Sequence, residues 1–261
     1  MRIPIYYVDA FTNRRFGGNP AAVMPLPRFL SDNILQAIAA ENNLSETAFL
    51  VPENGDYRLR WFTPLVEVPL CGHATLASAA VVMQRLEPGR ERVVFHSLSG
   101  PLTVKTQGAG YMMDFPARPS EPIPVPLELI SALGAVPTEV LVNEFNYMAV
   151  LKDESAVRCL APDFAAVARI GRPGVIVTAA NHATYDFVSR YFAPAKGIPE
   201  DPVTGAAHCM LAPYWAKRLG KNELHAFQAS RRGGEIICGI KNGRVELQGN
   251  CVFYLQGEVE I

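Results

Sequence analysis

The strongest constraint on the fold is a segment that recurs at about half the length of the chain. Residues 60–64 (RWFTP) match residues 190–194 (RYFAP) at an offset of 130. After a three-residue insertion the offset becomes 133 and persists from a predicted helix into the strand that follows. The matched positions there are Gly72 with Gly205, Ala74 with Ala207, Leu86 with Leu219, Ser97 with Ser230, and Gly100 with Gly233. An internal match of this extent indicates that two similar halves make up the chain.

The order of the predicted elements agrees with a duplication. Strands are expected at 47–51 and 57–62, then a helix from Gly72 to about Leu86, then a meander of three strands over 92–115. After a proline-rich linker at 116–126, further strands, a helix at 205–219 and four closing strands follow. Two α+β domains that use a strand–turn–helix–strand unit independently would give the same order.

We therefore expect an N-terminal half at 1–115, with Glu46 and His73, and a C-terminal half at 116–261, with Asp201. The last strand could cross into the first half. Because ligand pockets form preferentially between domains, we expect the ligand to bind between the two halves.

Composition excludes several classes of protein. Of the 261 residues, 49% are hydrophobic and 19% are charged, so the chain can bury a core and is not disordered. The formal net charge of −1 leaves no basic excess for a dedicated nucleic-acid binder. No stretch suits a signal peptide or a membrane span, and the five cysteines form no C-x-x-C pair. We expect a cytoplasmic protein with reduced thiols, no metal site, and neither nucleic-acid nor membrane partners.

Glu46 is the first candidate for chemistry. It lies in residues 43–49 (NLSETAF), between the end of a predicted helix and an apolar strand. Partial desolvation raises the pKa of a carboxyl group, so Glu46 could move a proton near neutral pH. The alternative is a solvated acid at the edge of a strand.

Two further polar segments begin the duplicated helices. In residues 67–75 (EVPLCGHAT), Gly72 permits an abrupt turn into a helix that carries His73 in its first turn. In residues 200–208 (EDPVTGAAH), Asp201 precedes the second helix start. Unpaired N–H groups at such starts bind anions, so we expect a carboxylate, sulfate or phosphate near the amides of Gly72, His73, Gly205 and Ala206. A helix cap with a buried cysteine, and a plain Asp-Pro turn, are the structural alternatives.

Several motifs follow one another along the chain. They are residues 9–11 (DAF), 18–23 (GNPAAV), 44–49 (LSETAF), 60–64 (RWFTP), 67–77 (EVPLCGHATLA), 197–205 (GIPEDPVTG), 225–228 (HAFQ) and 232–235 (RGGE). In this order they resemble the phenazine-biosynthesis PhzF-like family, which has the diaminopimelate-epimerase fold. The resemblance covers essentially the whole chain.

This resemblance implies an α+β fold of two pseudo-symmetric halves, each a curved, mostly antiparallel sheet around a central helix. It implies that Glu46 is the main acid and base, with His73 and Asp201 in the same pocket. The residues that it places at the substrate are Asn19, Ser45, Gly72, Gly205 and Ala206. The phenazine member isomerises a cyclohexadiene amino acid by moving a proton, so we expect neither cofactor nor metal here.

One departure separates this chain from the related epimerases and proline racemases. Those enzymes use two cysteines, one at each helix start, as paired bases. Here Cys71 occupies the first position, whereas Thr204 occupies the second. Because a hydroxyl is far too weak an acid to replace a thiolate, we do not expect two-base racemisation, and Cys71 is interpreted as a packed thiol.

The expected function is cofactor-independent isomerisation, by proton transfer, of a small, carboxylate-bearing, amino-acid-like substrate. A single-base epimerase or a dehydratase is the nearest alternative. A binding or interaction protein that keeps the fold without turnover is the alternative from another class. A homodimer is common for such folds, and the aromatic strands could support one.

Overall fold

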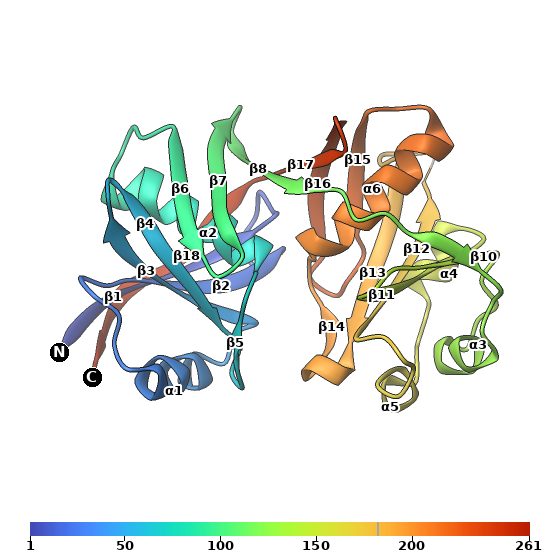
Figure 1. Cartoon of the computed structure of the whole chain (residues 1–261), viewed down its shortest axis with the longest axis horizontal. Helices are drawn as coiled ribbons and strands as arrows, with labels where there is room; N and C mark the ends of the chain where they lie inside the picture. The colour runs from blue at the N-terminus through green and yellow to red at the C-terminus, as the bar shows by residue number, and fades with distance from the viewer. Residues whose placement is uncertain (182) are drawn as a thin grey trace. The chain divides into compact units, whose positions relative to one another are not determined.

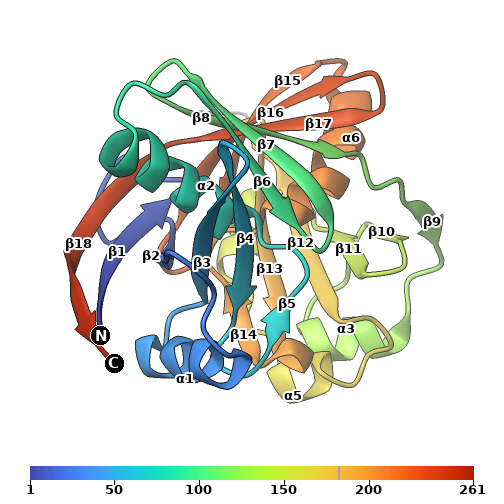
Figure 2. The same ribbon diagram turned by 60° about the vertical axis from the view of Figure 1, so that its left-hand side comes forward.

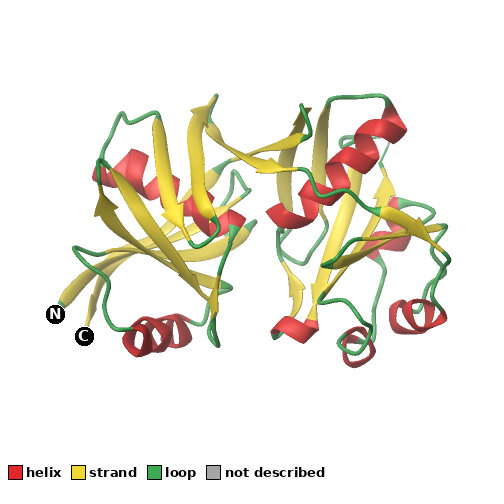
Figure 3. Cartoon of the chain, in the orientation of Figure 1, coloured by secondary structure: helices red, strands yellow, loops and turns green. Residues whose placement is uncertain are grey.

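The computed structural model describes residues 1–181 and 183–261. The chain divides into two units: unit 1 comprises residues 1–114 and 247–261, and unit 2 comprises residues 115–246. Each unit combines a sheet with helices, as Figure 1 and Figure 3 show. The fold is therefore α+β, which confirms the predicted class.

Unit 1 contains the predicted elements of the first half together with the last strand. Its strands are β1 (Arg2–Ala10), β2 (Asn19–Pro25), β3 (Glu46–Glu53), β4 (Asp56–Phe62), β5 (Glu67–Val68), β6 (Arg92–Ser97), β7 (Gly100–Gln107), β8 (Gly110–Pro116) and β18 (Cys251–Glu260). Its helices are α1 (Asp32–Asn42), α2 (Gly72–Val81) and the π-helical η1 (Val82–Leu86).

The sheet of unit 1 is mostly antiparallel. Strand β1 pairs antiparallel with β18 and with β2, and β2 pairs parallel with β3. Strand β4 pairs antiparallel with β3 and β5 and parallel with β6, and β7 pairs antiparallel with β6 and β8. Figure 2 shows β1 and β18 side by side, with the two termini close together.

Helix α2 is the central helix of unit 1. Every residue from His73 to Val81 is buried, and the helix packs against β1, β2, β3, β7 and β18. A helix that is apolar on all sides is stable only when it is surrounded in this way. The helix predicted from Gly72 to about Leu86 is α-helical only to Val81 and ends as the π-helical turn η1. Apolar periodicity does not distinguish these two helix types over a single turn, so the sequence did not predict the change.

Unit 2 repeats this architecture. Its strands are β9 (Glu121–Ile123), β10 (Glu139–Val142), β11 (Asn146–Val150), β12 (Gly174–Ala180), β13 (Phe187–Ala193), β14 (Ile198–Asp201), β15 (Glu223–Gln228), β16 (Gly234–Lys241) and β17 (Arg244–Gly249), the last of which ends in unit 1. Its helices are α3 (Leu127–Leu133), α4 (Glu154–Arg158), α5 (Phe164–Val167), the 3-10 helix η2 (Pro194–Lys196) and α6 (Gly205–Leu219).

The strand pairing of unit 2 matches that of unit 1 step by step. Strand β11 pairs antiparallel with β10 and parallel with β12, and β13 pairs antiparallel with β12 and β14 and parallel with β15. Strand β16 then pairs antiparallel with β15. The proline-rich stretch at 116–126, predicted as a linker, also contains a strand, because β9 pairs with β10.

An ion pair recurs at matched positions in the two units. The Arg60 guanidinium on β4 donates two hydrogen bonds to Glu67 on β5, both 2.7 Å long. Arg190 on β13 donates two to Glu200 on β14, at 2.7 and 3.0 Å. Each guanidinium also lies over the phenylalanine ring two residues later. This shared brace, with the shared pairing order, favours an internal duplication over two independently acquired units.

The correspondence after the two helices differs from the sequence alignment. The parallel registers of β4 with β6 and of β13 with β15 give an offset of 131 in that strand. Ser97 therefore corresponds to Gln228, not to Ser230. The extra residues lie in the next hairpin loop, which spans 98–99 in unit 1 and 229–233 in unit 2. Glycine and serine are common in such loops, so their match across it was coincidental.

Among the helices that the structure describes, none combines the length and the hydropathy that crossing a membrane requires.

Candidate active site

The entry to β2 is fixed so that Asn19 is fully buried. Gly18 has a φ of +63°, and a Cβ there would lie 2.1 Å from the backbone oxygen of Ala10, so only glycine fits. The preceding loop is held by Asp9, whose Oδ2 accepts a hydrogen bond of 2.9 Å from the Phe16 N–H. These contacts define where the Asn19 amide lies.

The Asn19 amide contacts His73, which in turn contacts Glu46. His73, from the first turn of α2, has its Nδ1 3.2 Å from Asn19 Nδ2 and 3.5 Å from Cys71 Sγ. Its Nε2 lies 3.3 Å from Oε2 of Glu46, the first residue of β3. The side chains of His73 and Glu46 are only 5% and 13% exposed. A carboxylate and an imidazole are therefore in contact and shielded from water.

His73 is neutral in this environment. Burial lowers the pKa of His73 from 6.5 to about 3, and the Pro20 backbone carbonyl offsets only part of that effect. Nδ1 faces the Asn19 amide and Nε2 faces Glu46, so each ring nitrogen lies beside a polar side chain. The contact between His73 and Glu46 is thus a polar contact of a neutral ring and not an ion pair.

The start of α2 offers backbone donors beside this cluster. Cys71 occupies the N-cap position in an extended conformation, and no side chain caps the helix. Among the residues that the structure describes, no acceptor bonds the N–H groups of Gly72 or His73. Such uncapped N–H groups, reinforced by the helix dipole, favour an anion.

The cluster also has the composition of a metal site. Glu46, Cys71 and His73 each offer one ligand atom, and these atoms lie within 4.8 Å of one another. A carboxylate, a thiolate and an imidazole suit a divalent ion such as Zn²⁺. The same three groups could therefore either move a proton or hold a cation.

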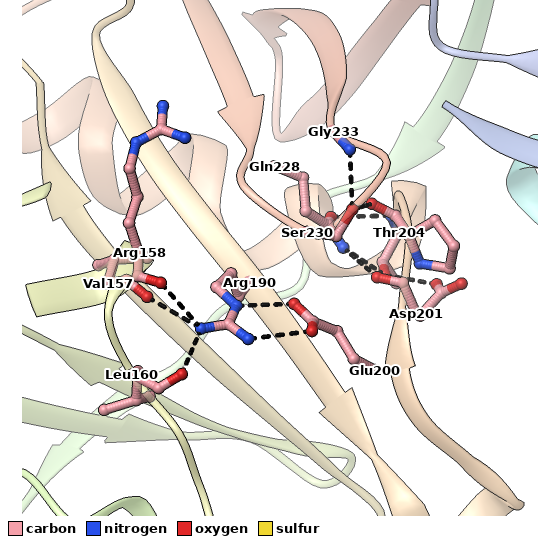
Figure 4. A network of polar contacts seen from close by, with 11 residues as sticks. Val157, Arg158, Leu160, Arg190, Glu200, Asp201, Thr204, Gln228, Ser230 and Gly233 are labelled. Carbon is pink, nitrogen blue, oxygen red and sulfur yellow. Dashed lines mark hydrogen bonds and ion pairs between the residues drawn. The ribbon is translucent and has the colours of Figure 1, made fainter. Parts of the chain in front are cut away.

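Asp201 and the start of α6 form the corresponding region of unit 2 (Figure 4). Asp201 ends β14, and its Oδ2 accepts a hydrogen bond of 2.5 Å from the Thr204 hydroxyl. Thr204 is the N-cap residue of α6. Within the described part of the chain, the N–H groups of Gly205 and Ala206 have no acceptor. This helix start can bind an anion for the same reason as that of α2.

Unit 2 lacks a carboxylate at the position of Glu46. The registers of β3 with β4 and of β12 with β13 make Gly174 its counterpart. A Cβ at Gly174 would lie 2.2 Å from Tyr191 Oη and 2.3 Å from Asn146 Oδ1, so these polar groups fill the space. Burial raises the pKa of Tyr191 to about 12, so its hydroxyl stays protonated and donates to Asn146 at 3.1 Å. At this position, therefore, unit 1 carries a carboxyl group and unit 2 does not.

The structure thus distributes the predicted site residues over both units. Unit 1 brings Asn19, Glu46 and His73 together, with Ser45 half-buried in the bend before β3. Unit 2 contains Asp201 and the two amides at the start of α6. Sequence reasoning quoted Gln228 in a motif without a role, although this residue hydrogen-bonds directly to Asp201 and Thr204.

Comparison with known proteins places the chain in a family. The family model described as phenazine biosynthesis-like protein matches residues 8–257. An uncharacterized isomerase of Pseudomonas aeruginosa is 49% identical over 261 residues, which is all of both chains. The crystal structure of a PhzF-family phenazine biosynthesis protein from Enterococcus faecalis has a TM-score of 0.97 at 46% identity, again over all of both chains.

A more distant structure shows the breadth of the fold. A hydroxyproline epimerase from Agrobacterium vitis has a TM-score of 0.61 at 10% identity, over 99% of this chain and 92% of its own. It confirms the epimerase-like architecture that the sequence predicts. On the family model, which matches nearly the whole chain, and on the high identity of full-length relatives, this chain belongs to the phenazine biosynthesis-like protein family.

Proposed function

We propose that this protein is an isomerase that moves a proton on a small, carboxylate-bearing, amino-acid-like substrate, with Glu46 as the acid and base. Proton transfer requires only a positioned acid–base group, so the proposed reaction uses neither cofactor nor metal. The relative of 49% identity is named as an isomerase, which supports this class of reaction.

One observation supports the proposal most. The Glu46 carboxylate lies 3.3 Å from the buried, neutral His73, beside the uncapped start of α2. An anionic substrate held by the Gly72 and His73 N–H groups would bring its reacting carbon near a carboxyl base. The neutral imidazole adds no positive charge beside the Glu46 carboxyl group.

The proposal assigns a second binding role to unit 2. Asp201 and the N–H groups of Gly205 and Ala206 would bind the substrate's ammonium and carboxylate groups, respectively. That both helix starts act on one substrate rests on the matched sequences of the two units. Because the counterpart of Glu46 is Gly174, one base removes the proton and returns it elsewhere, so no two-base racemisation is proposed.

The substitution Glu46→Gln tests the proposal. Amino acids, ring-containing ones first, are incubated with the protein in heavy water, and deuterium uptake is followed by mass spectrometry. Glutamine keeps the shape and one acceptor but cannot take up the proton. For a substrate that exchanges with the wild type, we expect turnover to fall by roughly 10²–10⁴-fold, whereas substrate binding stays near normal.

Glu53→Gln is the matched control, because Glu53 ends the same strand and pairs with Arg58 at the surface. It should exchange deuterium at the wild-type rate. Near wild-type turnover in Glu46→Gln would contradict the mechanism. Saturable binding without any exchange would instead indicate a binding protein, and inversion at one carbon or loss of water would indicate an epimerase or a dehydratase.

A further inference from the structure

Gln228 is a fully buried polar residue that the proposed mechanism does not use. It ends β15, in the HAFQ motif, and its side chain makes three hydrogen bonds to the segment before α6. Its Oε1 accepts from the Thr204 backbone N–H at 2.9 Å. Its Nε2 donates to the Asp201 backbone oxygen at 2.7 Å and to Thr204 Oγ1 at 3.2 Å. Figure 4 shows Gln228 beside both residues.

These bonds determine the direction of the Thr204 hydroxyl. A glutamine amide has two N–H donors, and Gln228 uses one on a carbonyl and the other on Thr204 Oγ1. Since Oγ1 accepts a hydrogen bond from the Gln228 amide, its own hydrogen is directed to the other neighbour, Oδ2 of Asp201, at 2.5 Å. A donated hydrogen bond favours the ionised form of a carboxylate.

Comparison of the two units shows which hydrogen bonds near α6 support the shared fold and which belong to unit 2. Ser230 Oγ donates to the Pro202 oxygen at 2.8 Å, and in unit 1 Ser99 Oγ donates to the Pro69 oxygen at 2.8 Å. That loop contact is therefore common to both units. The counterpart of Gln228 in unit 1 is a serine whose hydroxyl donates within its own hairpin loop. The Gln228 bonds occur only in the unit that carries Asp201.

We propose that Gln228 and Thr204 are positioning residues that together hold Asp201 as an oriented, ionised carboxylate for a cationic group of the substrate. The identity of that group, an ammonium, rests on the proposed function. The inference that Asp201 is oriented and ionised is argued from the hydrogen bonds and not from the proposed function. Thr204, at the position of the second cysteine in two-base enzymes, thus orients the Asp201 carboxylate through its hydroxyl hydrogen bond.

Other charged and titratable groups near Asp201 also affect its ionisation. Tyr191 lies opposite it across β13 and β14 and stays protonated, and it accepts a hydrogen bond from Lys196. Arg118 also acts electrostatically on Tyr191. His208 on α6 is neutral, because burial lowers its pKa to about 4. The neighbouring Glu200 is neutralised by Arg190.

Nuclear magnetic resonance of protein labelled with ¹³C in its aspartate carboxyl groups tests the inference without a substrate. The Asp201 signal is assigned by its loss in Asp201→Asn. In the wild type it should titrate below the usual aspartate value of about 3.9. Thr204→Val removes the hydroxyl at constant shape and should raise the midpoint by roughly one to two pH units, as loss of a hydrogen bond to a charged group implies. Gln228→Met should raise it in the same direction.

Two variants serve as controls. Thr204→Ser restores the hydroxyl and should titrate as the wild type does. Ser230→Ala loosens the same loop without touching the carboxylate, so it should lower stability and leave the midpoint in place. A wild-type midpoint at or above about 3.9, an unchanged midpoint in Thr204→Val, or an equal shift in Ser230→Ala would each overturn the inference.

Kinetics with an exchanging amino acid test the link to binding. At neutral pH Asp201 stays ionised in every variant, so Thr204→Val and Gln228→Met should raise KM roughly three- to tenfold through lost orientation, with kcat less affected. A fall in kcat at unchanged KM would contradict the binding role. If Glu46→Gln disproves the proposed function, the titration still decides the positioning role of Gln228 and Thr204.

Discussion

Acidification should destabilise the protein through His73, because this imidazole is buried without a charge. Its pKa is lowered from 6.5 to about 3. As the pH falls below 6.5, His73 becomes protonated in the unfolded chain, whereas in the folded chain it stays neutral down to about pH 3. The contribution of His73 to stability is therefore complete above pH 6.5 and is lost as the pH falls towards 3. At about 1.4 kcal/mol per pH unit, it should lower the free energy of unfolding by about 2 kcal/mol between pH 7 and pH 5.

Urea unfolding at pH 7, 6 and 5 measures this effect in wild type and variants. The difference between wild type and His73→Gln cancels the contribution of the carboxylates. His208→Gln should behave alike, because burial lowers the pKa of His208 to about 4. His225 is exposed, so His225→Gln is the matched control for replacing a histidine by glutamine at the surface. Each buried histidine that is replaced should make the fall in stability about 2 kcal/mol smaller.

The change with pH in the difference in free energy of unfolding between wild type and His73→Gln shows whether His73 is neutral or charged. If His73 were an imidazolium paired with the Glu46 carboxylate, its pKa would be raised. Its contribution would then be present at low pH and lost as the pH rises. The wild type would gain stability relative to His73→Gln on acidification. That result, or parallel curves for the two proteins, would refute the neutral imidazole and the reasoning from burial.

Two further predictions concern individual residues. Cys71→Ser should keep most of the turnover, because the matched position in unit 2 carries a hydroxyl and no thiol pair exists; a loss of several orders of magnitude in the exchange assay would make Cys71 a base. Gly174→Ala should lower the free energy of unfolding by about 1–3 kcal/mol, since the new Cβ would lie 2.2 Å from Tyr191 Oη. Gly171→Ala, where a Cβ meets open space, is its control in urea unfolding, and equal midpoints for the two variants would contradict the steric argument.

Much of the fold could be predicted because the elements are bounded by strong local signals. The helix expected at 205–219 has those bounds, with Gly205 at its start and Gly220 in the left-handed conformation after its end. The strand expected at 47–51 extends over Glu46–Glu53, since apolar patterning does not locate strand ends. The proline-rich composition of residues 116–126 predicts a linker. The stretch also contains β9, which lies at the edge of the sheet, where proline is tolerated.

The contacts within the site depend on tertiary structure, so fewer of them could be predicted from the sequence. Asn19 and His73 lie 54 residues apart in the sequence, and Gln228 and Thr204 lie 24 apart. Helical or strand periodicity carries no information about such pairs. The sequence match predicts an offset of 133 after the helices, which pairs Ser97 with Ser230. The structure instead matches Ser97 with Gln228, the last residue of β15. Registers from the paired strands were needed to find it.

The two units share a framework but differ at the residues that we propose act on the substrate. Both keep the arginine–glutamate brace, the shared strand order and an uncapped helix start, which together hold the backbone donors for an anion. They differ at the position of Glu46, whose counterpart in unit 2 is Gly174. Unit 1 places Glu46 against a neutral histidine, whereas unit 2 has a glycine at that position. Near its own helix start, unit 2 instead has Asp201, held by a hydroxyl. A racemase that works with two equivalent bases needs symmetry at these positions. Glu46 in one unit and the hydrogen-bonded Asp201 in the other instead suit the proposed mechanism, in which one group moves the proton and another holds the substrate.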